Sequence, residues 1–305
     1  KQRKIVTLLL AVVGMLMSSS AFATHFRGGN TSWVIESQDV AAGTTTIQFT
    51  VQSFWRRSFN FNYSGVSGNG DFGETFTISG SAGGTATINF VAASEDIVGA
   101  VQTFSETYTT GSIVTENVLD SCCRLSSLEN GQNDDRFDMI STLNLADNDA
   151  GVVTDAGPVL GNNSPILELA IGGLQTFQLS ATDDVDAASD ITWSTPSSSQ
   201  SGLSPTNPFI PGNPANQLSL GSDGLLSWDT TGGLVGQLFA FQAYATDSNG
   251  STNPVDFLIR FCDSSADPDC GGFIPNEVPA PSALALMGLA LAGFGFARRR
   301  SSKVS

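Results

Sequence analysis

The chain has very little positive charge outside its two ends. Of the 13 lysines and arginines in its 305 residues, seven lie in residues 1–4 and 298–303, and the six in between are all arginine. All 29 acidic residues lie in this body, so six arginines against 29 carboxylates give it a formal charge of −23. Such a surface repels nucleic acid and anionic lipid and favours solvated cations. We therefore expect no nucleic-acid partner.

Histidine is almost absent as well, since His25 is the single one. One histidine cannot form a multi-histidine zinc site, and it leaves a single candidate base for a Ser-His-Asp triad. Paired carboxylates are abundant, as glycoside hydrolysis requires, but they fall in turns, where carboxylates are common anyway. We expect a protein that is not an enzyme, and a secreted hydrolase is the weakest of the alternatives.

The body also lacks a convincing 3.6-residue apolar repeat, which would indicate amphipathic helices. Alternation of period two recurs instead, and turn-rich breaks separate the alternating runs. The clearest run, residues 44–53, places Ile47, Phe49 and Val51 on one face. The pattern predicts an all-β protein whose first β-domain covers residues 24–155.

The N-terminus has the three parts of a secretory signal peptide. A basic start, residues 1–4, precedes the apolar run Ile5–Met17, and Ala21 and Ala23 provide the small residues that signal peptidase needs. We expect signal peptidase to remove residues 1–23 after the body has been exported.

The C-terminal residues carry a second signal, built from three parts in a fixed order. A proline-spaced motif is followed by an apolar run, residues 283–297, and then by a basic cluster. The motif and the basic cluster consist, in order, of Val278, Pro279, Ala280, Pro281 and Ser282, and of Arg298, Arg299 and Arg300. As a helix the apolar run measures only about 22 Å at 1.5 Å per residue, and the arginines act as a stop on the cytoplasmic side.

This order resembles the PEP-CTERM sorting signal of bacteria that export exopolysaccharide, although Ala280 stands where the family pattern has glutamate. The resemblance implies an exosortase as processing enzyme. Residues 278–305 would first anchor the protein in the inner membrane through a transmembrane helix. After cleavage the body would reach the cell envelope, the cell surface or the extracellular matrix. An ordinary C-terminal anchor helix is the alternative.

The second half of the chain has clearer marks of a β-sandwich. An acidic, turn-forming linker covers residues 144–165. Four short motifs occur in order from its end: Asn162–Pro165, Thr182–Asp186, Asp223–Thr230 and Tyr244–Gly250. These motifs resemble the immunoglobulin-like and cadherin-like sandwiches of bacterial surface proteins. The resemblance implies a seven-strand Greek-key sandwich over residues 156–262, followed by a linker at 263–277.

Two acidic loops of this half are candidates for a cation site. Asp183, Asp184 and Asp186 follow one predicted strand, and Asp247 follows another. Asp183 and Asp247 are each the last residue of an Ala-Thr-Asp triplet. Closely spaced oxygen ligands suit Ca²⁺, and residues 147–149 offer a similar cluster. Plain turn residues are the alternative interpretation. No cofactor is required by the sequence, and calcium is a hypothesis.

The four cysteines are Cys122, Cys123, Cys262 and Cys270. An exported chain meets an oxidising compartment, so pairing is expected, and four cysteines allow three connectivities. We favour Cys262 with Cys270, which closes a short loop after the last strand. Cys122 and Cys123 then form a vicinal disulfide or remain two thiols, and cross-links between the domains are the other alternative.

Aromatic side chains gather around Arg56 and Arg57, with Phe54 and Trp55 before them and Phe59, Phe61 and Tyr63 after them. An exposed cluster of this kind could stack on sugar rings or pair with anionic polysaccharide. We favour the other interpretation, in which the aromatic residues belong to the core and the arginines cover its rim.

These features together predict two β-sandwich-like domains between a signal peptide and a sorting helix. The predicted function is structural, in the cell envelope or extracellular matrix, in association with exopolysaccharide or biofilm. The alternative is a carbohydrate-binding or adhesion module that depends on calcium and has extracellular polysaccharide as its partner.

Overall fold

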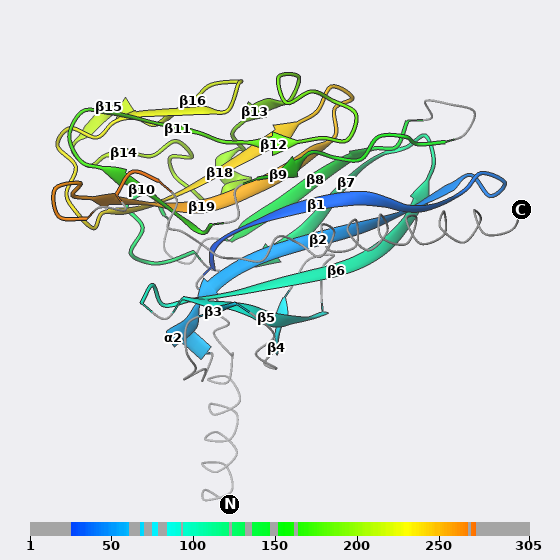
Figure 1. The fold of residues 1–305 in the computed structure, drawn as a ribbon, viewed down its shortest axis with the longest axis horizontal. Helices are drawn as coiled ribbons and strands as arrows, with labels where there is room; N and C mark the ends of the chain where they lie inside the picture. The colour runs from blue at the N-terminus through cyan, green and yellow to red at the C-terminus, as the bar shows by residue number, and fades with distance from the viewer. Residues whose placement is uncertain are drawn as a thin grey trace, which may run out of the picture.

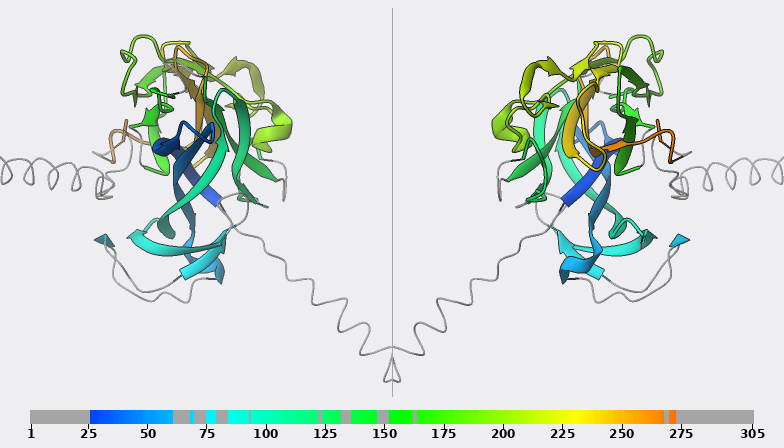
Figure 2. Two further views of the ribbon diagram at one scale, coloured as in Figure 1. Left: turned by 90° about the vertical axis from the view of Figure 1, so that its right-hand side faces the viewer. Right: turned by 90° about the vertical axis from the view of Figure 1, so that its left-hand side faces the viewer.

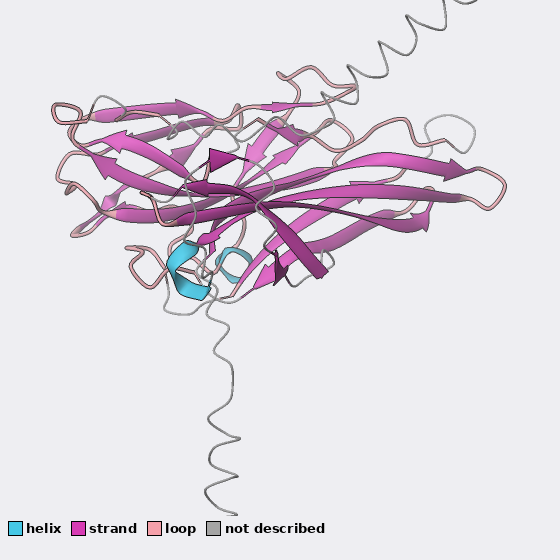
Figure 3. Cartoon of the chain, turned by 60° about the horizontal axis from the view of Figure 1, so that its bottom comes forward, coloured by secondary structure: helices cyan, strands magenta, loops and turns pink. Residues whose placement is uncertain are grey.

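The computed structural model describes residues 26–60, 68–69, 75–78, 84–92, 94–121, 124–131, 136–146, 152–161, 164–267 and 270–272. Within these ranges the protein is nearly all β, and the two helices are single turns (Figure 3). They are α2 (Arg57–Asn60) and α3 (Ser198–Ser201). The predicted all-β fold is confirmed.

Most strands of the first half are long. They are β1 (Phe26–Asp39), β2 (Thr44–Arg56), β3 (Gly68–Asn69), β4 (Thr75–Ile78), β5 (Gly84–Ala92), β6 (Ile97–Thr109), β7 (Ile113–Ser121) and β8 (Phe137–Asn144). The alternation predicted in residues 44–53 is present in β2, where Ile47, Phe49 and Val51 are all buried.

Most strands of the second half are shorter. They are β9 (Val159–Leu160), β10 (Ile166–Ala170), β11 (Leu174–Gln178), β12 (Ala181–Thr182), β13 (Thr192–Ser194), β14 (Phe209–Ile210), β15 (Asn213–Gln217), β16 (Ser219–Leu220), β17 (Leu225–Asp229), β18 (Leu238–Thr246) and β19 (Thr252–Cys262). The last two form a long hairpin whose turn is the Asp247–Gly250 segment, a sequence typical of tight turns.

One large sheet contains strands of both halves. Its order is β13-β18-β19-β1-β2-β6-β5-β3, so the last strand of the chain, β19, lies beside the first, β1 (Figure 1). β19 also pairs with β8 in antiparallel and with β10 in parallel orientation. β19 therefore connects the two halves of the chain through backbone hydrogen bonds.

Each half also has its own packed layers, seen from the side in Figure 2. In the first half, residues of β7 and β8 share a buried cluster with those of β1, β2 and β5, and the Phe26 and Phe137 rings stack with centroids 3.9 Å apart. In the second half, the small sheet β11-β17-β16 covers β18 and β19, and Trp228 contacts Phe239 and Phe261.

The predicted domain boundary at residues 155 and 156 stays a prediction. The two largest buried clusters run from Phe26 to Ala156 and from Leu160 to Phe261, on either side of that region, while a third mixes residues of both halves. The predicted linker is not an exposed tether, because Val153 and Asp155 are buried and the Gln38 side chain bonds both backbone groups of Val153.

Two adjacent glycines allow β1 to enter the middle of the sheet. A Cβ atom on Gly28 would lie 2.5 Å from the carbonyl oxygen of Asp256 in β19, and one on Gly29 would lie 2.4 Å from that of Gln52 in β2. Gly28 also has φ of +144°, which side chains disfavour. The Gly-Gly pair is thus needed for close approach to both neighbouring strands.

A buried ion pair lies at the same junction. Arg124, from the segment between β7 and β8, donates to both carboxylate oxygens of Asp256 at 3.1 and 2.5 Å, and both side chains are essentially inaccessible to water. The guanidinium also donates to the carbonyl of Ser201 at 2.6 Å and lies over the Phe137 ring. Such a pair is strongly destabilising when only one partner is removed, because the other charge is left buried.

We predict that Arg124→Met lowers the free energy of unfolding by about 3–5 kcal/mol, as for other buried pairs broken on one side. The double variant Arg124→Met with Asp256→Leu should lose clearly less, since no charge is left unpaired. Urea unfolding measures both. The matched control is Arg136→Met, whose side chain is 65% exposed and pairs with Asp120 at the surface, where about 1 kcal/mol or less is expected. Equal losses in the single and double variants would contradict the assignment.

Candidate metal centre

Three separated stretches of chain bring carboxylates to one place. Asp155 comes from the segment before β9, Asp183 and Asp184 come from the loop after β12, and Asp247 begins the turn between β18 and β19. Ligand oxygens of Asp155, Asp183 and Asp184 lie within 4.8 Å of one another. We call Asp155, Asp183, Asp184 and Asp247 the acidic cluster.

Asp247 is held in place by the turn that it begins. Its Oδ1 accepts backbone N–H groups from Asn249, Gly250 and Ser251 at 3.1, 2.8 and 2.8 Å, as expected for an aspartate that caps a tight turn. Its Oδ2 is buried and has no hydrogen-bond donor among the described residues.

Asp183 and Asp155 repeat this arrangement. Asp183 Oδ1 accepts the N–H groups of Val185 and Asp186, at 2.9 and 3.1 Å, while its Oδ2 is buried without a donor. Asp155 Oδ2 accepts the side-chain amide of Asn249 at 2.5 Å, and its Oδ1 is buried without a donor. Within the described chain, each of the three carboxylates thus has one oxygen fixed and one buried oxygen unsatisfied.

Asp186 connects the two loops rather than adding a free oxygen. Its carboxylate accepts both the backbone N–H and the hydroxyl of Ser248, each at 2.7 Å. This contact fixes the loop after β12 against the β18–β19 turn. Of the four aspartates proposed from the sequence, the structure brings Asp183 and Asp184 together with Asp155. Asp247 lies close enough for the charges of Asp155 and Asp183 to act on it, and Asp186 has a bridging position.

Sequence reasoning missed Asp155 and Asn249. Asp155 belongs to the segment interpreted as a linker, and the signal for it was the Asp-Ala-Gly-Pro turn at 155–158. The oxygen-rich residues Asp147, Asn148 and Asp149, proposed as a second cluster, lie outside the described residues.

Burial and mutual repulsion make two of these carboxylates difficult to ionise. Burial, followed by the charge of Asp183, raises the pKa of Asp155 from its ordinary value of 3.8 to about 6. Burial, with the charges of Asp155 and Asp183, raises the pKa of Asp247 to about 7, against the opposing effect of its hydrogen bonds to Ser251 and Gly250. The raised pKa values mean that ionising these two carboxylates destabilises the folded state. Binding of protons or of another cation at this place therefore favours folding.

Among the described residues, no arginine forms an ion pair with the cluster. All six arginines of the body form ion pairs elsewhere: Arg27, Arg56 and Arg57 with Asp96, Arg124 with Asp256, Arg136 with Asp120 and Asp138, and Arg260 with Glu95 and Glu168. The donor set is entirely oxygen, which suits Ca²⁺ and not zinc, because zinc sites use imidazole or thiolate ligands.

The remaining sites proposed from the sequence are placed as follows. Cys262 and Cys270 form a disulfide with their Cα atoms 5.7 Å apart. The following lie outside the described residues: Cys122 and Cys123, the signal-cleavage residues Ala21 and Ala23, the motif Val278–Ser282, and Arg298, Arg299 and Arg300. No helix in the described ranges is long and apolar enough to cross a membrane.

The aromatic and arginine cluster does not form an exposed platform in its described part. Phe54 and Trp55 are 1% and 3% exposed, so both belong to the core. Arg56 and Arg57 lie beside Asp96, whose carboxylate also accepts the backbone N–H and the hydroxyl of Ser58. This is the arrangement of core aromatics and rim arginines that the sequence favoured.

We predict that the metal-free protein loses stability as the pH rises from about 4 to about 8. The folded state binds more protons than the unfolded state between the ordinary pKa of 3.8 and the raised values of about 6 and 7, so deprotonation in this window disfavours folding. Urea unfolding in chelator measures the slope. Asp247→Asn should remove much of it, whereas Asp223→Asn, at an exposed turn aspartate with a similar backbone contact to Leu225, should not. A flat profile in the parent protein would be inconsistent with this account.

Two family profiles match the chain. The profile described as the N-terminal part of integrin beta-like proteins A–E matches residues 27–146, which comprise nearly all of β1 and the strands through β8. The profile of the PEP-CTERM protein-sorting motif matches residues 277–300, and so includes Ala280 and the arginine cluster. No curated protein matches the chain. Residues 27–146 are therefore similar to the N-terminal part of integrin beta-like proteins, and the PEP-CTERM sorting motif marks the chain as an exported, envelope-associated substrate of an exosortase.

Proposed function

We propose that the protein is a non-enzymatic surface or matrix protein with an adhesion-like role, associated with exopolysaccharide or biofilm, and that calcium stabilises its body. The sorting motif supports delivery to the outside of the cell. The similarity of residues 27–146 to integrin beta-like proteins supports an adhesion-like role. The all-β body, with its short turns and strongly negative charge, suits a rigid module in an aqueous matrix.

The observation that carries calcium binding is the set of three buried carboxylate oxygens without donors: Asp155 Oδ1, Asp183 Oδ2 and Asp247 Oδ2. A buried acceptor without a partner costs free energy, and more when it is charged. Ca²⁺ takes six to eight oxygens, including carboxylates and water. Asp155, Asp183, Asp184 and Asp247 would hold the ion, and water would complete its shell.

Bound calcium would add a connection among three separated parts of the chain. The ion would connect the segment before β9, the loop after β12 and the β18–β19 turn, which already meet through Asp186 and Ser248 and through Asp155 and Asn249. It would also neutralise the repulsion that raises the pKa of Asp155 and Asp247. The expected effect is greater stability in calcium-containing surroundings outside the cell.

We predict that Ca²⁺ raises the melting temperature of the mature protein relative to chelator. At calcium concentrations about 100-fold above Kd, a ligand that binds only the folded state contributes about 2.7 kcal/mol, which corresponds to a shift of roughly 5–10 °C for a protein of this size. Calorimetric melts in calcium and in chelator measure it.

Asp155→Ala and Asp183→Ala should each abolish the difference between calcium and chelator, because each removes an unsatisfied oxygen. The control Asp223→Asn should retain the difference. Mg²⁺ should have a smaller effect, since it demands a tighter octahedral shell than this set of loops offers. Identical melts in calcium and chelator would leave these aspartates as turn residues.

We also predict that the mature protein from its native host ends close to Pro279–Ser282. The prediction follows from the sequence, because proline disfavours helix at the preceding residue and an extended stretch before the apolar run is one that a processing enzyme can bind. Mass spectrometry of the surface-located protein gives its C-terminus directly.

The comparison variant replaces Arg298, Arg299 and Arg300 with asparagine, which removes the cytoplasmic stop and should prevent processing at Pro279–Ser282. If Lys303 is still attached to the surface-located parent protein, the sorting hypothesis is wrong and the tail is a plain anchor.

A further inference from the structure

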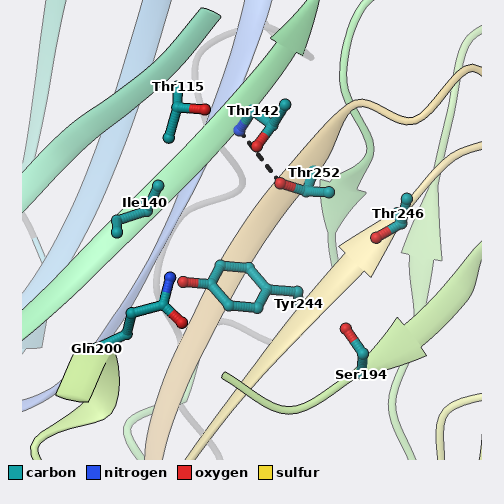
Figure 4. A pocket seen from close by; sticks show the side chains of 8 residues that line it. All are labelled: Thr115, Ile140, Thr142, Ser194, Gln200, Tyr244, Thr246 and Thr252. Carbon is teal, nitrogen blue, oxygen red and sulfur yellow. Dashed lines mark hydrogen bonds between the residues drawn. The ribbon is translucent and has the colours of Figure 1, made fainter. Parts of the chain in front are cut away.

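A polar groove lies where the two halves of the chain meet. It has a volume of about 350 Å³, within the range of about 300–1,000 Å³ that is usual for ligand sites. Its lining residues, shown in Figure 4, are Thr115, Ile140, Thr142, Ser194, Gln200, Tyr244, Thr246 and Thr252. Six of the eight carry a hydroxyl group and one an amide, and none is charged.

Four of these hydroxyl groups form a regular row across four strands. Thr115 of β7 is paired with Thr142 of β8, Thr142 with Thr252 of β19, and Thr252 with Thr246 of β18. Directly paired residues in antiparallel strands point to the same face, and neighbouring strands lie about 4.8 Å apart. We call Thr115, Thr142, Thr252 and Thr246 the threonine row. Its spacing is comparable with the length of one unit of an extended sugar chain.

The other lining residues surround this row with both polar and apolar surface. Tyr244 lies two residues before Thr246 in β18, opposite Ser194 of β13, and Ile140 lies two residues before Thr142 in β8. Each is therefore on the same face as the row. Rings and aliphatic groups can pack against the C–H faces of a sugar, while hydroxyl groups contact its edges.

Several of these polar groups remain available to a ligand. The backbone N–H of Thr142 donates to the hydroxyl oxygen of Thr252 at 3.1 Å, which leaves the Thr252 hydroxyl proton free to be donated. Gln200 accepts through Oε1 from the N–H and the hydroxyl of Ser197, which fixes its amide and leaves its NH₂ group for another acceptor. The Gln200 side chain lies beside the hydroxyl end of Tyr244 (Figure 4).

The charges around the groove select against anionic ligands. Burial, followed by the charge of Asp138, raises the pKa of Tyr244 to about 12, so its hydroxyl stays neutral. All six arginines of the body are engaged with carboxylates and the body carries no lysine. An anionic ligand is therefore disfavoured, and the hydroxyl and amide lining suits a ligand rich in groups that both donate and accept hydrogen bonds.

We propose that this groove binds a segment of a neutral polysaccharide, which lies along the threonine row and packs on Tyr244. The inference rests on the proposed association with exopolysaccharide and assigns the residues that would carry it. Because Thr115 and Thr142 come from the first half and Ser194, Gln200, Tyr244, Thr246 and Thr252 from the second, the site exists only when both halves are assembled.

The test is affinity electrophoresis of the mature protein, in calcium buffer, through gels that contain a soluble polysaccharide. Dextran, a mixed-linkage β-glucan and galactomannan serve as neutral probes, and alginate serves as the anionic probe. At least one neutral polysaccharide should retard the protein and alginate should not. Retardation by none of the three neutral probes, or equal retardation by alginate, would overturn the proposal.

Two variants localise the binding. The double variant Thr115→Val with Thr246→Val keeps the side-chain volume but removes two hydroxyl groups, and should weaken retardation about tenfold, as the loss of one or two hydrogen bonds predicts. Ser194→Trp, at an exposed position, should block the groove. The control Thr103→Val removes an exposed hydroxyl from β6, outside the groove, and should bind like the parent.

Parent-like binding by both groove variants would exclude this site. Such a failure would leave the proposed surface location intact, because the mass of the mature C-terminus tests that location separately. Melting curves of each variant confirm that it is folded, and the exposed Ser194→Trp variant keeps the groove testable if the double variant does not fold.

Discussion

The arrangement of this protein depends on the buried ion pair between Arg124 and Asp256. Asp256 lies in the middle of β19, and Arg124 lies between β7 and β8, 132 residues earlier in the chain. Each charge is shielded from water and is compensated mainly by the other. Removing either partner leaves a buried, unpaired charge, which strongly destabilises the fold. The pair therefore holds the first half against the strand that pairs with β1, β8, β10 and β18.

The other arginines of the body are likewise paired with carboxylates. Asp96 is surrounded by three arginines, Arg260 joins Glu95 to Glu168, and Arg136 pairs at the surface. Each of the six arginines thus forms a defined contact with a carboxylate. Asp155, Asp183 and Asp247 form no ion pair with these arginines. Each has a buried carboxylate oxygen without a donor in the described part of the chain, so neutralisation at this place comes from solution, by protons or by metal ions.

The acidic cluster and the threonine row are neighbours on the β18–β19 hairpin. Thr246 precedes Asp247, and Thr252 begins the strand that follows the turn. The backbone N–H groups of Asn249, Gly250 and Ser251 hold Asp247, and Asn249 contacts Asp155. The contacts that hold this turn therefore also support the strand registers that align Thr246 with Thr252 and Thr252 with Thr142. Both candidate sites consequently depend on contacts between the two halves of the chain.

The sequence by itself determined the features that are local. Period-two alternation predicts which face of β2 is buried, because side chains of a strand alternate between faces, and the signals at both ends depend only on contiguous residues. In β19 both faces are buried, because strands and loops of both halves pack against it. The sequence also indicated Asp183, Asp184 and Asp247 as candidate oxygen ligands.

Only the tertiary structure decided which strands are neighbours, because the period of an apolar pattern specifies the face of a strand but not its partner or register. Asp155 joined the cluster because its segment is buried against the second half. The Arg124–Asp256 pair and the threonine row exist because β19 lies beside strands more than 100 residues away in the chain.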